Sequence, residues 1–155
     1  MRLERLELNG FNHFSQPTML DCRDLPDGLI AIVGPNGGGK TTLLDAGIAS
    51  LYGVAVQNRS FPSREGTLHT YATSRESYLD ARWSLDGRGT YRARVSIDGV
   101  KRTADAVLLE IGPDGREHIL NDGKASTFKQ VVAERFPSLR SLLASAFASQ
   151  SKRGS

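Results

Sequence analysis

At 155 residues, the chain has the size of one domain or of a piece of one, and its 39% hydrophobic and 24% charged residues are typical of a globular protein. The formal net charge of +3 permits an acidic partner such as DNA without requiring one. The single cysteine, Cys22, excludes an intrachain disulfide and favours an intracellular setting, and three scattered histidines give no metal-ligand spacing. No apolar run is long enough to cross a membrane, and no signal peptide precedes the first predicted strand.

The chain begins with a predicted β-hairpin. Residues 1–8 alternate apolar and charged side chains, with one slip at Arg5-Leu6 that predicts a bulge or a twist. Asn9-Gly10 is a turn signal, and residues 18–22 read as the second, antiparallel strand. A further turn at residues 25–28 leads directly into the most informative stretch of the sequence.

That stretch matches the phosphate-binding pattern G-x-x-x-x-G-K-[ST], and it consists of Gly34, Pro35, Asn36, Gly37, Gly38, Gly39, Lys40 and Thr41. The apolar run 29–33 before it predicts a strand buried on both faces. The helical spacing of residues 42–52 after it puts Leu44, Ile48 and Leu51 on one stripe, with Gly53 as a helix stop. The alternative is a glycine-rich turn without a ligand, but strand, glycine loop and helix in this order favour a phosphate site.

Each residue type in the loop suits a nucleotide. Glycines permit a backbone that points successive N–H groups at the β-phosphate, and the N-terminal end of the following helix adds free N–H groups and a partial positive charge. Lys40 is placed to reach the β- and γ-phosphates, and the Thr41 hydroxyl is placed to bind Mg²⁺. The motif therefore predicts ATP and Mg²⁺ as ligands.

The rest of the chain divides into four predicted segments. Residues 54–77 are polar, lack a clean period and read as a long loop excursion. Residues 78–120 read as an antiparallel meander with strands at 78–85, 90–97, 107–111 and 118–120. Residues 126–150 contain a helix capped by Ser126-Thr127, a second helix capped by Ser138, and a short strand ending at Gln150; residues 151–155 form a frayed basic tail.

Three features together resemble the N-terminal half of the ATPase head in the coiled-coil ABC-type ATPases, the group that includes SMC, SbcC and RecN proteins. They are the turn Leu8-Asn9-Gly10-Phe11, the phosphate loop with its helix ending in Leu51-Tyr52-Gly53, and a glutamine about a hundred residues later, Gln150. The helix ending and the short span to Gln150 look more like SbcC than like the chromosome-condensing proteins. The resemblance covers essentially the whole chain and implies a mixed α/β fold: a three-layer-like head lobe with an antiparallel β subdomain, incomplete without a C-terminal half.

The resemblance also implies roles for individual residues. The loop residues and Thr42 would bind the nucleotide, Lys40 and Gln150 would be catalytic, and Thr41 and Gln150 would bind Mg²⁺. In several relatives the segment after the turn phenylalanine carries a basic residue that reaches the nucleotide. Here Asn12 and His13 occupy that segment, and each is either a substitute for the basic residue or an ordinary loop residue.

The hydrolysis machinery of the resembled family is missing from this sequence, which contains neither a Leu-Ser-Gly-Gly signature nor four apolar residues followed by Asp-Glu. We therefore expect the chain to bind ATP weakly or moderately and to hydrolyse it negligibly alone. The resemblance implies a C-terminal half of the same head, a head-to-head homodimer, double-stranded DNA and a possible nuclease subunit as partners. It implies no membrane partner and a cytoplasmic, nucleoid-associated location.

A basic stretch is a second candidate site. Between Ala81 and Thr103 the chain has six basic side chains against two acidic ones, namely Arg82, Arg88, Arg92, Arg94, Lys101 and Arg102 against Asp86 and Asp98. Such a face either contacts DNA phosphates or is an ordinary solvated strand face, and the second reading is favoured. Three other functions stay open: an ATPase of a transporter, an ATPase of a nuclease-associated defence system, and a nucleotide-gated DNA-binding module that never hydrolyses ATP.

Overall fold

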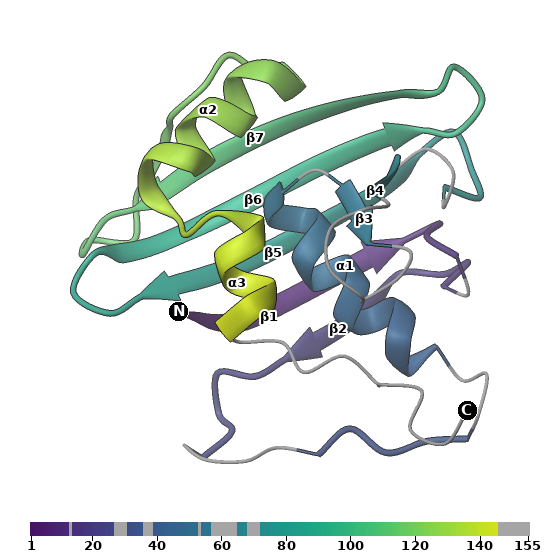
Figure 1. The fold of residues 1–155 in the computed structure, drawn as a ribbon, viewed down its shortest axis with the longest axis horizontal. Helices are drawn as coiled ribbons and strands as arrows, with labels where there is room; N and C mark the ends of the chain where they lie inside the picture. Colours follow the sequence, from purple (N-terminus) through teal and green to yellow (C-terminus); the bar gives the residue numbers. More distant parts are fainter. Residues whose placement is uncertain are drawn as a thin grey trace.

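The computed structural model describes residues 1–12, 14–26, 31–35, 39–52, 54–56, 65–67 and 72–145. Its main element is a six-stranded antiparallel sheet with the strand order β2-β1-β5-β6-β7-β8 (Figure 1). The strands of this sheet are β1 (Arg2–Asn9), β2 (Thr18–Asp21), β5 (Ser77–Leu85), β6 (Gly89–Asp98), β7 (Thr103–Ile111) and β8 (Glu117–Ile119). Two further strands, β3 (Val54–Val56) and β4 (Glu65–Thr67), pair with each other.

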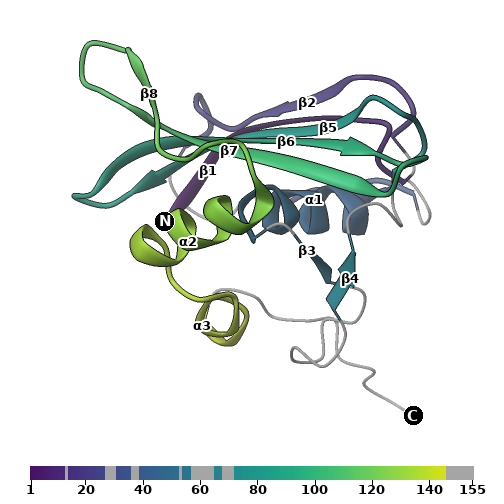
Figure 2. The ribbon, with the colours of Figure 1, turned by 90° about the horizontal axis from the view of Figure 1, so that it is seen from above.

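The described helices are α1 (Lys40–Tyr52), α2 (Ala125–Arg135) and α3 (Leu139–Ser145). Figure 2 shows all three on one face of the large sheet, with α1 and α2 against the strands and the β3–β4 pair beyond α1. The opposite face carries no described helix. The predicted mixed α/β fold with an antiparallel sheet is confirmed. Within the described residues, no helix is both long and apolar enough to span a lipid bilayer.

The core forms between the sheet and the helices because the strands alternate in polarity. In β5, every second residue from Ser77 to Leu85 is buried, and β6 has the same pattern over the predicted inward residues Tyr91, Ala93, Val95 and Ile97. The helices contribute Ala46, Ala49 and Leu51 from α1 and Phe128 and Val132 from α2. Tyr91 meets Phe136 edge to face, with ring centroids 5.2 Å apart.

The N-terminal hairpin follows the prediction closely. β1 pairs with β2 in antiparallel register, with Leu8 opposite Thr18 and Arg5 opposite Asp21. The register between β1 and β5 shifts between Leu3 and Arg5, so the bulge lies next to the predicted slip at Arg5-Leu6. The meander strands are also present, and β7 begins at Thr103, four residues before the predicted start at 107.

Some local predictions need correction. Residues 31–33 of the predicted buried strand 29–33 form no strand, and Val33 is 87% exposed; residues 29–30 lie outside the described part of the chain. A strand needs a neighbour to pair its N–H and C=O groups, and no strand in the described part pairs with residues 31–33. On α1, Leu44 is 41% exposed, so of the predicted stripe only Ile48 and Leu51 are buried.

The other two differences concern residues 54–77 and the start of α2. The predicted loop excursion contains the β3–β4 pair. The predicted cap at Ser126-Thr127 is wrong, because α2 already begins at Ala125 and its N-cap, Lys124, makes no side-chain capping bond. The turn before it is ordered instead by Asp122, whose Oδ1 accepts hydrogen bonds from Lys124 N at 3.2 Å and Thr127 Oγ1 at 2.5 Å. The predicted Ser138 cap is confirmed, since its Oγ accepts from Ser141 N at 3.1 Å.

Candidate nucleotide-binding site

The two ends of the predicted phosphate loop meet at the N-terminal end of α1. Gly34 and Pro35 are exposed and belong to no regular element, and α1 begins at Lys40. Gly39, directly before the helix, is buried and has a φ of 90°, a conformation that glycine adopts readily and other residues rarely adopt. Its carbonyl accepts the first helical hydrogen bond, from Leu43 N at 2.9 Å. Asn36, Gly37 and Gly38 lie outside the described residues, so their predicted roles stay predictions.

Lys40 lies across this loop. Its Nζ donates a hydrogen bond to the Gly34 carbonyl, which joins the first and seventh residues of the motif. The stem of the lysine also follows Gly34 closely, because a Cβ placed on that glycine would lie 3.7 Å from the Lys40 Cδ. One ammonium group is therefore held beside the N-terminal end of a helix, where the helix dipole also favours an anion.

Thr41, the last residue of the motif, and Thr42 after it lie in the first turn of α1. The backbone of Thr41 is helical, and its side chain lies outside the described part of the structure. Thr42 is 6% exposed, and its Oγ1 accepts a hydrogen bond from the Asn12 Nδ2 at 3.0 Å. The structure thus brings the predicted candidate Asn12 to the first turn of the helix. His13, the other candidate from that turn, lies outside the described residues.

Gln150 also lies outside the described residues, as does the segment after α3, so its predicted contact with Mg²⁺ and water stays a prediction. The described part of the chain does show what links α1 to the region before Gln150. The Tyr52 hydroxyl, at the last residue of α1, donates to the Pro137 carbonyl at 2.6 Å, just before α3. Burial raises the pKa of Tyr52 to about 12. No pattern in the sequence indicates this contact, since its residues are 85 positions apart.

Three of the six predicted basic residues, Arg82, Arg92 and Arg94, lie on strands β5 and β6, and each of them is ion-paired. Arg92 binds Asp80 through two hydrogen bonds of 2.9 and 2.7 Å, and its third, at 2.9 Å, goes to Glu117. These carboxylates raise the pKa of Arg92, chiefly because its guanidinium group donates hydrogen bonds to Asp80. Arg82 pairs with Glu4 at 2.7 Å, and Arg94 lies 3.4 Å from Asp80. The contacts therefore favour the solvated, ion-paired strand face over a free cationic surface.

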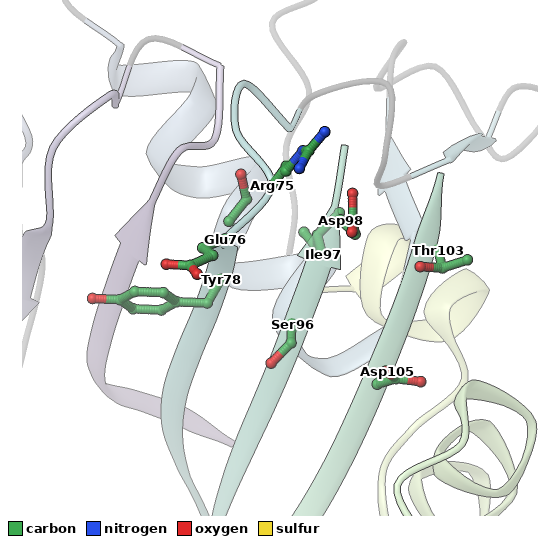
Figure 3. A pocket seen from close by; sticks show the side chains of 9 residues that line it. Arg75, Glu76, Tyr78, Ser96, Ile97, Asp98, Thr103 and Asp105 are labelled. Carbon is green, nitrogen blue, oxygen red and sulfur yellow. The ribbon is translucent and has the colours of Figure 1, made fainter. Parts of the chain in front are cut away.

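A polar hollow of about 270 Å³ opens near one end of β5, β6 and β7 (Figure 3). Its lining includes the carboxylates of Glu76, Asp98 and Asp105, with Arg75 as its basic residue. The pKa of Asp98 is lowered, chiefly because its carboxylate accepts a hydrogen bond from the backbone N–H of Lys101. Ionised carboxylates repel phosphate groups, and none of the loop residues lines this hollow. Among the described residues, no group of three His, Cys, Asp or Glu is arranged to hold a metal ion.

Comparison with known proteins places these features in a family. The family model described as an AAA domain matches residues 5–142. The chain is 33% identical over 138 residues to the SbcC component of the nuclease SbcCD from Deinococcus radiodurans, a match that covers 86% of this chain and 14% of that protein. It is 50% identical over 46 residues to the chromosome partition protein Smc of Methylococcus capsulatus, covering 30% of this chain and 4% of that protein.

The chain thus spans a small fraction of the length of these relatives. Among solved structures, the SMC head domain from Thermotoga maritima aligns with a TM-score of 0.47 and 21% identity, over 76% of this chain and 39% of that one. The match to the SbcC protein extends much further along this chain than the match to Smc, in agreement with the features at Leu51-Tyr52-Gly53 that favour SbcC-type proteins.

Proposed function

We propose that this chain, which belongs to the AAA domain family, binds Mg²⁺-ATP at residues 34–42 and is the nucleotide-binding lobe of an SMC/SbcC-like ATPase in chromosome or DNA maintenance. The observation that carries the proposal is the meeting of Gly34, Gly39 and Lys40 at the N-terminal end of α1. Free N–H groups, a positive φ at Gly39 and a nearby ammonium group together suit a phosphate chain.

In this proposal the main-chain N–H groups of the loop surround the β-phosphate. Pro35 has no N–H to donate and contributes through its fixed φ, which restricts the backbone of the loop. Lys40 exchanges its bond to the Gly34 carbonyl for the β- and γ-phosphate oxygens, since a charge-assisted bond to an anion is stronger than a bond to a neutral carbonyl. Thr41 and Gln150 bind Mg²⁺. The metal supplies charge neutralisation on the β- and γ-oxygens when it is bound.

We further propose that hydrolysis needs a second lobe and a second head. The sequence contains no Leu-Ser-Gly-Gly and no run of four apolar residues followed by Asp-Glu, the motif whose carboxylate would orient the attacking water. Exposure of the apolar residues before the loop supports this view, because Ile32 is 42% and Val33 is 87% exposed. Neighbouring strands from a C-terminal half would cover these side chains and pair their backbone.

The remaining partners are proposed from the relatives. The relative from the nuclease SbcCD supports a nuclease subunit as partner and a role in DNA repair, and the Smc relatives support chromosome maintenance; both agree with a cytoplasmic, nucleoid-associated protein. Double-stranded DNA is proposed as a ligand of the assembled heads. For that ligand, the exposed cations at strand turns, Arg88, Lys101 and Arg102, are better placed than Arg92, whose charge is matched by Asp80 and Glu117.

The test is a calorimetric titration of the chain with Mg²⁺-ATP, compared with Lys40→Ala. We expect the variant to weaken binding about tenfold or more, because it removes a charge-assisted contact to the phosphates. Lys101→Ala is the matched control, since it removes an exposed lysine from the β6–β7 turn and should leave the affinity unchanged. Equal affinities of the wild-type chain and Lys40→Ala would refute the assignment of Lys40 and, with it, the proposed site.

A further inference from the structure

The contact between Asn12 and Thr42 joins two segments that lie thirty residues apart in the sequence. Asn12 belongs to the turn between β1 and β2, and Thr42 lies in the first turn of α1; Figure 1 shows that end of the hairpin beside the start of the helix. We propose that Asn12 is a positioning residue for nucleotide binding, whose amide donates to Thr42 Oγ1 and so directs the Thr42 hydroxyl proton toward the bound phosphates. This inference rests on the proposed function.

The turn that carries Asn12 is held firmly on both sides. Phe11 is fully buried and exchanges two backbone hydrogen bonds with Phe14, at 3.1 and 3.0 Å. The preceding Gly10 carbonyl accepts from the Ser77 hydroxyl at 2.6 Å and from Thr73 N at 2.8 Å. Such anchoring fixes where the Asn12 side chain can reach, which is what a positioning residue requires.

Asn12 itself has a left-handed backbone, with a φ of 50°. Asparagine tolerates this region better than most residues with a side chain, and only glycine adopts it without strain. The conformation turns the side chain from the hairpin to the helix, where Nδ2 lies 3.0 Å from Thr42 Oγ1. The pairing of an anchored turn with an asparagine at its positive-φ position therefore delivers one amide donor to the first turn of α1.

The chemistry of Asn12 and Thr42 fixes which group donates the hydrogen bond between them. An amide nitrogen only donates, whereas a threonine hydroxyl has one proton to donate and lone pairs that accept. Because Asn12 occupies an acceptor position of Thr42 Oγ1, the hydroxyl proton must point elsewhere. Thr42 is 6% exposed and lies in the first turn of α1, where the N–H groups have no partner within the helix, so a phosphate oxygen bound there would be a suitable acceptor. The merely structural alternative is a proton donated to the carbonyl one turn earlier in the chain.

The experiment compares Mg²⁺-ATP affinity and nucleotide-free thermal stability in a set of variants of the chain. Asn12→Gly removes the amide without straining the positive φ. Thr42→Val removes the hydroxyl at nearly constant shape, and the double variant completes a thermodynamic cycle. Asn12→Asp replaces the donor by an acceptor, which turns the Thr42 proton toward the carboxylate. Asn9→Asp is the matched control, because it places the same charge at the end of β1, where the Asn9 side chain contacts the Glu76 carbonyl at 3.4 Å.

We expect Asn12→Gly to weaken Mg²⁺-ATP binding about three- to tenfold, with the double variant no weaker than Thr42→Val alone. Asn12→Asp should weaken it more than Asn12→Gly, and Asn9→Asp should change it less than about twofold.

Three results would overturn the inference. In the first, Asn12→Gly lowers the melting temperature but leaves the Mg²⁺-ATP affinity unchanged. In the second, the losses of affinity in Asn12→Gly and Thr42→Val add up in the double variant, and in the third, Asn12→Asp and Asn9→Asp lose the same affinity. A chain whose Lys40→Ala variant binds as well as the wild type would instead refute the proposed function, and this inference with it.

Discussion

The sheet and the stretch before the phosphate loop differ in how far they bury the same residue type. Val95, in the middle of β6, is 1% exposed, whereas Val33, just before the loop, is 87% exposed. β6 has a hydrogen-bonded strand on each side and helices over its inner face, while no described strand pairs with residues 31–33. The burial of the same residue type, valine, thus depends on whether this chain supplies its neighbours.

This difference separates what holds the chain together from what we propose to be its working site. The inner face of the sheet is covered by α1 and α2 within the chain, so the core contributes stability without further partners. The loop is anchored through α1, on the core side, and is open on the side of residues 31–35. A site between a stable scaffold and an uncovered apolar edge is suited to closing when a second lobe binds.

The largest effect that tests this comparison comes from one substitution made at both valines. Valine and threonine have nearly the same shape, so Val95→Thr places a hydroxyl in the core without a cavity. We expect it to lower the free energy of unfolding by about 1–3 kcal/mol, the cost of a buried hydroxyl without a partner. Val33→Thr should change it by less than about 0.5 kcal/mol, as exposed sites do. Chemical denaturation of both variants measures the two values.

Equal losses at the two positions would mean that Val33 is already covered within the chain, and the comparison would then fail. Val33→Thr could also leave the stability of this chain unchanged and still weaken its assembly with a C-terminal lobe. That result would sharpen the comparison, because the Val33 side chain would then contribute only when its neighbours are present.

Most of the fold could be predicted from the sequence because it depends on local patterns. The strict alternation of Tyr91, Ala93, Val95 and Ile97 fixes a strand and its buried face, and turn residues such as Asp98-Gly99 separate it from the next strand. Residues 31–33 are not the predicted strand, because composition records how apolar a segment is and not which neighbours it finds. The two short strands β3 and β4 were missed since three residues are too few to show a period.

The candidate site was predictable in part for the same reason. The phosphate loop is a contiguous motif, so Gly34, Gly39 and Lys40 could be assigned together. The contact of Asn12 with Thr42 and that of Tyr52 with Pro137 join segments distant in sequence, and no spacing rule connects them. The ion pairs of Arg92 could not be foreseen either, because its partner Glu117 reaches it from another strand.

The second test concerns the outer face of the sheet, which is the face opposite the helices. On this face, ion pairs between side chains of neighbouring strands take the place of helix packing. Asp80 is 12% exposed and binds both Arg92 and Arg94. Asp80→Ala should lower the free energy of unfolding by about 1–2 kcal/mol, because it removes a two-bond contact and leaves two guanidinium groups less well paired. Asp86→Ala is the matched control and should leave the free energy of unfolding nearly unchanged, since Asp86 is fully exposed and lies 4.0 Å from its partner, the amino terminus. Chemical denaturation of both variants measures the difference.

Similar small losses in both aspartate variants would show that the outer face contributes as little as any surface ion pair. The stability of the chain would then depend on the helix-covered face alone. The guanidinium groups of Arg92 and Arg94 would be only weakly paired and could contact DNA phosphates.

The smallest expected effect tests the link between α1 and the segment that leads to Gln150. Tyr52→Phe removes the hydrogen bond to the Pro137 carbonyl and should cost about 0.5–1.5 kcal/mol at neutral pH. The pKa of Tyr52 is about 12 in the folded chain against an ordinary value of 10, so the folded state holds this proton more tightly than the unfolded state. The contribution of the hydroxyl is thus fully present below pH 10 and is lost as the pH rises toward about 12.

Denaturation of the wild-type chain and of Tyr52→Phe across that pH range separates this hydroxyl from other groups that titrate there, since those groups are common to both proteins. The stability advantage of the wild type should shrink between pH 10 and about 12. A stability advantage that stays constant through this pH window would contradict the burial of Tyr52. The end of α1 would then lack a fixed contact to the segment before α3, just as residues 31–33 lack a strand that pairs with them in the described part of the chain.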